Sequence, residues 1–149
     1  MDDPPKIGAP LVWIIVFCRH SSTWWIEALP GTYKHVRAYA FVPPLSSWLF
    51  YDVSLSGTVI YTAPDGAAAE AYIGEFTRDA DLVGFRPVPG TKRLRIRPFT
   101  CVSAIAHLVG VRSGALRPDR LYRDLVAAGG TPLGQQRPAT GPGLRDAAT

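Results

Sequence analysis

The sequence predicts an α+β domain in which a small antiparallel sheet packs against a helix that begins late in the chain, at a cysteine. Three observations predict this class. Strand-like segments fill the first half of the chain, two helical patterns follow residue 100, and 47% hydrophobic residues in a chain of 149 can form one core. We expect one domain over residues 1–129, and a Gly/Pro-rich tail over 130–149 that is either held by partners or mobile.

The strands are predicted from their apolar patterns. The run "LVWIIVFC" at residues 11–18 is typical of a buried strand. The segments 34–42 and 46–54 alternate between apolar and polar side chains and meet at a Pro-Pro pair, which favours a hairpin. A further strand, "SGTVIYT", follows directly after a Ser-Gly turn.

The helices are predicted from composition and from apolar spacing. An Ala- and Glu-rich segment predicts a helix over about residues 66–78, and two short extended pieces follow it around a Pro-Gly turn. Residues 101–110 carry apolar side chains at i, i+3, i+4 and i+7, which indicates one buried helix face. Pro118 opens a last helix that stops at a Gly-Gly pair.

The chain shows no signal for export or membrane insertion. Its longest apolar run, residues 11–18, is far shorter than the roughly 20 residues that a membrane span needs. The opening "MDDPP" is acidic, where a secretory signal would be basic. Two cysteines are too few for a disulfide framework. We expect cytoplasmic synthesis without a signal peptide, with incorporation into a virion as an alternative, and no membrane partner.

Charge is divided unevenly along the chain. Residues 1–85 carry a net charge of −4 and residues 86–149 a net charge of +8, which together give the overall +4. A basic second half can face an acidic protein, an acidic cell-wall polymer or nucleic acid, or can form a solvated surface. We expect protein neighbours in a larger assembly and regard nucleic acid as the weaker alternative, because the basic segment lacks interleaved aromatic residues.

Cys101 is the first candidate for chemistry. It follows Thr100, a suitable N-cap, and would therefore lie in the first turn of a helix. Unpaired backbone N–H groups and the positive end of the helix dipole favour the thiolate there, and the thiolate is the form that attacks carbonyl groups. A buried, inert cysteine is the alternative.

His35 and Asp52 are the second candidate pair. If the strands 34–42 and 46–54 pair symmetrically about the bond between Pro43 and Pro44, His35 lies directly opposite Asp52. A carboxylate beside an imidazole selects one tautomer and stabilises the imidazolium. The same register pairs Tyr39 with Trp48 and Arg37 with Phe50. A purely structural His–Asp pair is the alternative.

The order of these residues resembles that of a known family. "YKHVRAYAF", "SWLFYDVS" and "RPFTCVSAIAHLVG" contain a strand histidine, a polar residue on the next strand and a late cysteine at a helix start. This order is similar to that of circularly permuted papain-like proteins, which are related to the NlpC-type cell-wall peptidases and the lecithin:retinol acyltransferase group. The similarity covers roughly residues 31–125. The chain also looks like small uncharacterised proteins of phage and prophage structural modules.

The resemblance implies a thiol hydrolase. Cys101 would attack an amide, ester or thioester, His35 would act as base and then as acid, and Asp52 would orient His35. The substrate would be a peptide or a cell-wall amide, and no cofactor or metal is expected. The chain departs from the family in lacking a Gln or Asn just before Cys101 and in lacking an Asn-Cys-Glu signature. The alternative is a non-catalytic structural or interaction protein of a phage particle, a tail-associated component that keeps the fold.

Other residues are weaker candidates. His107 lies about 240° around its helix from Cys101, which directs it away from that thiol. Cys18 and His20 form a Cys-x-His pair with no second pair to complete a zinc site. Arginines on one predicted strand face and on the last helix could contact phosphates or a protein neighbour. These arginines are Arg93, Arg95, Arg97, Arg117, Arg120 and Arg123.

Overall fold

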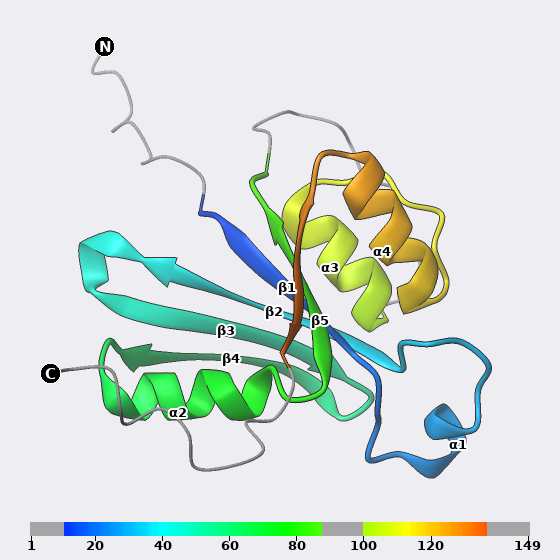
Figure 1. The fold of residues 1–149 in the computed structure, drawn as a ribbon, viewed down its shortest axis with the longest axis horizontal. Coiled ribbons are helices and arrows are strands. Elements are labelled where there is room, and N and C mark those ends of the chain that lie inside the picture. The colour runs from blue at the N-terminus through cyan, green and yellow to red at the C-terminus, as the bar shows by residue number, and fades with distance from the viewer. Residues whose placement is uncertain (1–10, 88–99, 137–149) are drawn as a thin grey trace, which may run out of the picture.

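The computed structural model describes residues 11–87 and 100–136, which form a six-stranded antiparallel sheet with helices on both faces (Figure 1). The strands lie in the order β4-β3-β2-β1-β5-β6. They span Trp13–Cys18 (β1), His35–Val42 (β2), Ser47–Ser54 (β3), Gly57–Pro64 (β4), Ala80–Phe85 (β5) and Thr131–Gln136 (β6). The α+β class with an antiparallel sheet is thus confirmed.

Four α-helices accompany the sheet in the described residues, with one 3₁₀ turn, Pro43–Leu45, in the β2–β3 hairpin. The helices are Trp24–Glu27 (α1), Ala67–Phe76 (α2), Cys101–Val109 (α3) and Pro118–Ala127 (α4). Helices α3 and α4 lie side by side over one face, and α2 lies over the other (Figure 1). None of the helices in the ranges described is long and apolar enough to cross a bilayer.

Strict alternation along β1 and β2 divides the core into two layers. Ile15, Phe17 and Val36 face α3 and α4, and the predicted apolar stripe of α3 is buried against them. The opposite layer, beneath α2, contains Val16 and Cys18 of β1 together with aromatic side chains. These aromatic side chains are Tyr39, Phe50 and Phe76. Because β1 has helices over both of its faces, its sequence is continuously apolar, as expected for a strand in the middle of a sheet.

One expected boundary is wrong. Residues 131–136 were predicted to begin the tail, but they form β6 at the edge of the sheet, paired with β5. A Gly/Pro-rich segment can still donate and accept backbone hydrogen bonds at an edge, where a proline interrupts only one side of the ladder. Gly130 permits the close approach of β6 to α4, because a Cβ there would lie 2.8 Å from the Leu125 carbonyl oxygen. The rest of the predicted tail, 137–149, is outside the described residues.

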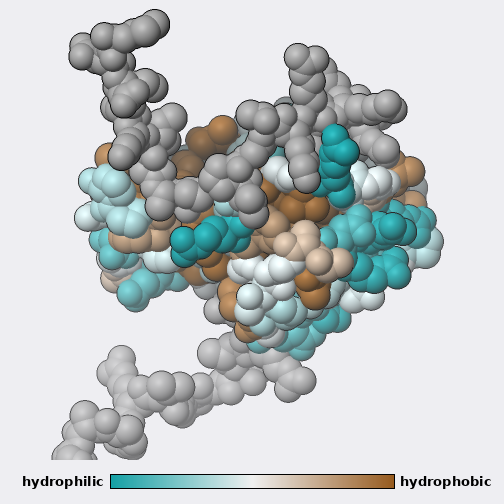
Figure 2. All heavy atoms as spheres, turned by 90° about the horizontal axis from the view of Figure 1, so that it is seen from above, coloured by the Kyte–Doolittle hydropathy of each residue, from teal (hydrophilic) through white to brown (hydrophobic). Residues whose placement is uncertain are grey.

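Several large apolar side chains remain on the surface. Figure 2 shows apolar residues between polar ones on one face of the molecule. The most exposed are Trp24 in α1, at 81%, and Leu116 just before α4, at 79%. Exposed apolar side chains also occur on the edge strand β4, at Val59 and Ile60.

Candidate functional site

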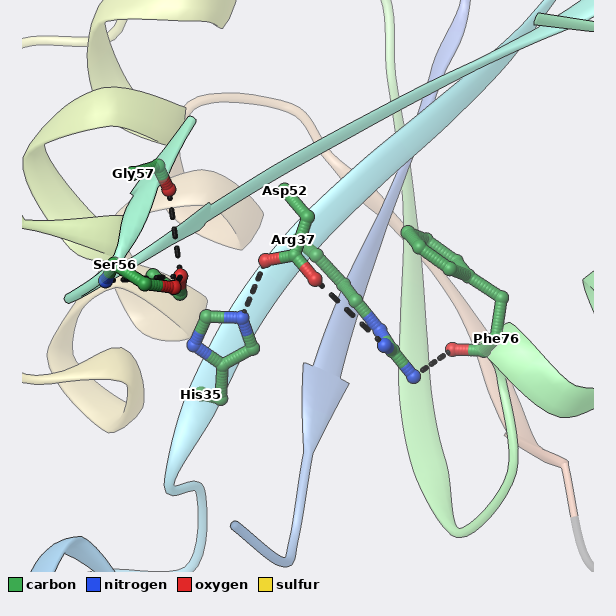
Figure 3. A network of polar contacts seen from close by, with 7 residues as sticks. His35, Arg37, Asp52, Ser56, Gly57 and Phe76 are labelled. Atoms are coloured by element: carbon green, nitrogen blue, oxygen red, sulfur yellow. Dashed lines mark hydrogen bonds and ion pairs between the residues drawn. The ribbon is translucent and has the colours of Figure 1, made fainter. Parts of the chain in front are cut away.

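The candidate site lies where β2 begins and β3 ends. His35, the first residue of β2, donates a hydrogen bond from Nε2 to Oδ1 of Asp52 on β3 at 2.7 Å (Figure 3). His35 pairs with Cys18 and Asp52 follows Phe50 by two residues, and because Cys18 and Phe50 belong to the layer beneath α2, alternation places His35 and Asp52 on that face of the sheet. The side chains are 23% and 25% exposed, so they are shielded from bulk water and yet accessible from outside.

The register that brings them together differs from the predicted one. Val42 pairs with Ser47 and Tyr39 with Phe50, so the strands are shifted by two positions from symmetric pairing about residues 43 and 44. The 3₁₀ turn and the left-handed Ser46 make the connection longer than expected. His35 and Asp52 are therefore diagonal neighbours, not direct partners. A shift of two positions keeps every side chain on its face, so the histidine still reaches the carboxylate.

Cys101 is the first residue of α3, as predicted from Thr100. The Thr100 hydroxyl accepts a hydrogen bond from the Ser103 backbone N–H, and the Ser103 hydroxyl accepts one from the Thr100 N–H, which completes a capping box. This cap fixes where the helix begins and so fixes the direction of the cysteine. The Cys101 side chain is partly buried, and the His35 side chain lies close enough to affect its pKa.

The electrostatic surroundings favour a thiolate at Cys101. Burial by itself raises the pKa of this thiol. The hydrogen bond and charge of His35, together with the backbone N–H groups of Val36 and Val102, outweigh burial and bring the pKa below its ordinary value. A lowered thiol pKa at a helix start is characteristic of nucleophilic cysteines.

The partners of His35 favour its protonated form. Burial lowers the pKa of His35, but hydrogen bonds to Asp52 and Cys101 and the negative charges of both raise it to about 9. For Asp52, burial raises the pKa, and the contacts with His35 and the charge of Arg37 more than offset this and lower it. The three groups thus stabilise one another as thiolate, imidazolium and carboxylate.

Two further residues belong to this environment, and sequence reasoning assigned neither of them to it. Cys18 pairs with His35 across β1 and β2 and is buried, and burial raises the pKa of its thiol. Arg37 lies two residues after His35 on the same face and contacts Asp52. The i+2 spacing was visible in the sequence, but the register that brings Arg37 to the carboxylate was not.

The structure places the weaker candidates away from this cluster. His107 is exposed on α3, and His20 pairs with Glu27 beside α1. Arg117 donates to the Pro30 carbonyl oxygen, and Arg120 pairs with Asp124 within α4. Arg93, Arg95 and Arg97 lie outside the described residues. Within the described part of the chain, no group of three or more His, Cys, Asp or Glu side chains could hold a metal ion.

The fold and this cluster define an α+β domain in which a cysteine at a helix start lies near a histidine that hydrogen-bonds with an aspartate. Comparison of the chain with protein-family models, curated proteins and solved structures found no match in any of the three.

Proposed function

We propose that the protein is a papain-like thiol hydrolase that uses Cys101, His35 and Asp52 to cleave an amide or peptide bond. One observation carries this proposal: a single imidazole hydrogen-bonds with a carboxylate on the neighbouring strand and also interacts electrostatically with a cysteine at a helix start. Because Nε2 of His35 is occupied by Asp52, Nδ1 is the ring nitrogen left to serve the sulfur. That division of roles is what nucleophile activation requires.

The chemistry proceeds in two balanced steps. The Cys101 thiolate attacks the carbonyl carbon, the C–N bond breaks, and the His35 imidazolium gives its proton to the departing amine. Water then attacks the resulting thioester and gives one proton to His35, and the Cys101 thiolate leaves as the acid product forms. The site regains its starting charges. Asp52 stays ionised throughout and keeps the ring oriented.

Backbone groups are available to stabilise the oxyanion. The first N–H groups of a helix have no partner inside the helix, and the cap uses the one on Ser103. The Val102 N–H already stabilises the Cys101 thiolate, so the Cys101 N–H at the start of α3 is the backbone donor proposed for a developing negative charge. The second donor, which a Gln or Asn side chain supplies in papain-like proteins, is absent immediately before Cys101. A cell-wall peptide is the proposed substrate on the strength of the family resemblance alone.

The nucleophile is tested by alkylation of the thiols with iodoacetamide across pH, read by peptide mass spectrometry so that Cys101 and Cys18 are followed separately. We expect Cys101 to react well below the pH at which a free thiol does. His35→Ala should slow its reaction at pH 6.5 by about tenfold or more, because the thiolate then loses its stabilising partner. His107→Ala is the matched control. Equal rates in these two variants, with Cys101 titrating as a free thiol, would reject the proposal.

Turnover is tested separately with an activated ester. An acyl group trapped on Cys101 and released at a rate that depends on His35 would support hydrolysis. A reactive thiol that is acylated once and never released would favour the alternative, a non-catalytic interaction protein of a larger assembly that keeps the arrangement.

A further inference from the structure

Arg37 lies on the far side of Asp52 from His35. Continuing the β2–β3 register by one residue beyond its last pair, Ala38 with Tyr51, brings Arg37 level with Asp52. The two oxygens of the carboxylate are then divided between two cations. Oδ1 accepts from His35 at 2.7 Å, and Oδ2 lies 3.8 Å from Nη1 of Arg37 (Figure 3). Rotation of the carboxylate would disturb both contacts.

The guanidinium is itself held from a third element. Nη2 of Arg37 donates to the backbone carbonyl oxygen of Phe76, the last residue of α2, at 2.6 Å. The guanidinium carbon also lies 4.1 Å from the centre of the Phe76 ring, within the range of a cation–π contact. A long side chain fixed at two points by one residue loses little further freedom when it meets a carboxylate.

The titratable groups near Arg37 come from three elements. Asp52 on β3, Cys18 on β1 and Tyr72 on α2 all experience its charge. Burial raises the pKa of both Cys18 and Tyr72, so these two groups remain neutral around neutral pH. The anion that Arg37 faces under those conditions is therefore Asp52.

We propose that Arg37 is a positioning residue that, anchored by Phe76 of α2, holds the Asp52 carboxylate in the orientation that receives His35. Its catalytic meaning rests on the function proposed above. The positioning of the Asp52 carboxylate does not depend on that function, because the contacts that lead from Phe76 through Arg37 and Asp52 to His35 do not involve Cys101. Arg37 acts on the ring only through the carboxylate.

The experiment follows the protonation of His35 by NMR titration of its ring nitrogens in wild type, Arg37→Gln, Asp52→Asn and the double variant. If Arg37 positions Asp52, Arg37→Gln weakens the His–Asp hydrogen bond and lowers the titration midpoint of His35, by on the order of one pH unit. If only its charge mattered, removal of a nearby cation would raise the midpoint. In the Asp52→Asn background, Arg37→Gln should no longer lower the midpoint of His35, because the group it acts through is gone.

Two variants keep the experiment decisive. Arg37→Lys retains the positive charge but loses the planar guanidinium with its several N–H donors, and we expect it to lower the titration midpoint of His35 in part. This variant also replaces Arg37→Gln if Arg37→Gln does not fold. Arg78→Gln removes an exposed arginine that pairs with Glu75, and should leave His35 unchanged. A midpoint that rises or stays constant in Arg37→Gln, or a fall of equal size in the Asp52→Asn background, would overturn the positioning role.

The two proposals fail in different ways. If Cys101 alkylates as an ordinary thiol while Arg37→Gln still lowers the midpoint of His35, the hydrolase is rejected and the positioning role stands. If Cys101 is reactive and dependent on His35 and releases its acyl group while Arg37→Gln leaves the midpoint of His35 unmoved, the hydrolase stands and Arg37 is limited to attaching α2 to the sheet.

Discussion

At the scale of single residues, His35 connects the other two members of the candidate site. Its ring is partly buried, which by itself disfavours the charged form, yet two anionic partners reverse that preference. The same contacts that would prepare Cys101 for attack therefore also bear on the stability of the fold. This coupling gives the site a signature that can be measured without a substrate.

The stability that His35 contributes should depend on pH. Its pKa in the folded protein, about 9, lies above the ordinary 6.5, so folding favours the protonated ring. The contribution is complete below pH 6.5 and is lost as the pH rises through about 9. We expect the difference in unfolding free energy between wild type and His35→Gln to be larger at pH 6 than at pH 10, measured by urea denaturation. His20→Gln, at an exposed histidine, is the control. A difference in unfolding free energy that increases toward pH 10 would contradict the inference that folding favours the protonated ring of His35.

At the scale of elements, the loop between β1 and β2 determines where β2 begins and therefore where His35 lies. Asp119, in the first turn of α4, accepts hydrogen bonds from the backbone N–H groups of Thr32 and Tyr33, at 2.8 and 3.3 Å. The Tyr33 hydroxyl also donates to Asp81 of β5. These contacts tie the chain immediately before His35 to two elements far away in sequence. They therefore fix the position of the first residue of β2, His35.

Loss of the Asp119 contacts should loosen the entry into β2. We expect Asp119→Ala to lower the free energy of unfolding by about 1–3 kcal/mol, because two backbone donors lose their acceptor. Cys101 alkylation should slow as well, since His35 follows two residues after Tyr33. Asp119→Asn keeps one acceptor oxygen and should retain part of both properties. An Asp119→Ala protein with wild-type stability and wild-type thiol reactivity would show that the loop is positioned by other contacts.

At the scale of the whole molecule, the sheet has two different edges. The β4 edge is a regular eight-residue strand, paired with β3 from Ser47–Pro64 to Ser54–Gly57 without a shift. The β6 edge is interrupted by a register shift opposite Leu82 and Val83 and by Pro132. Prolines and bulges discourage further strands from adding to an edge. β6 thus covers β5, whose residues are largely buried.

Removal of β6 should expose a strand that is built for the interior of the sheet. We expect a chain ending at Gly130 to lose about 1–3 kcal/mol of unfolding free energy, through lost backbone pairing and lost burial over β5. It should also aggregate more readily through the freed edge. A chain ending at Gln136 is the comparator, because it keeps the described sheet complete. Equal stability and equal monomer content of the two chains, by denaturation and sedimentation, would show that β6 is dispensable.

Much of this arrangement could be predicted because it depends on neighbours in sequence. Alternation placed His35 and Asp52 on one face of the sheet although the predicted register was wrong, since a shift of two positions leaves faces unchanged. Thr100 marked the start of α3, because capping involves residues only three positions apart. The two-residue shift of the hairpin was missed, because it depends on the 3₁₀ turn and the left-handed Ser46 that follow two prolines.

The sequence by itself determined strands β1–β4, the starts of α3 and α4 and the side chains that share a face within a strand or helix, because each depends on dihedral preferences and spacing within a few residues. Only the tertiary structure decided that the start of α3 meets the start of β2, that Arg37 reaches Asp52, and that residues 131–136 join the sheet. These outcomes depend on packing between residues that lie from 15 to 66 positions apart in the chain. Such packing is set by the burial of the whole core and not by any local pattern.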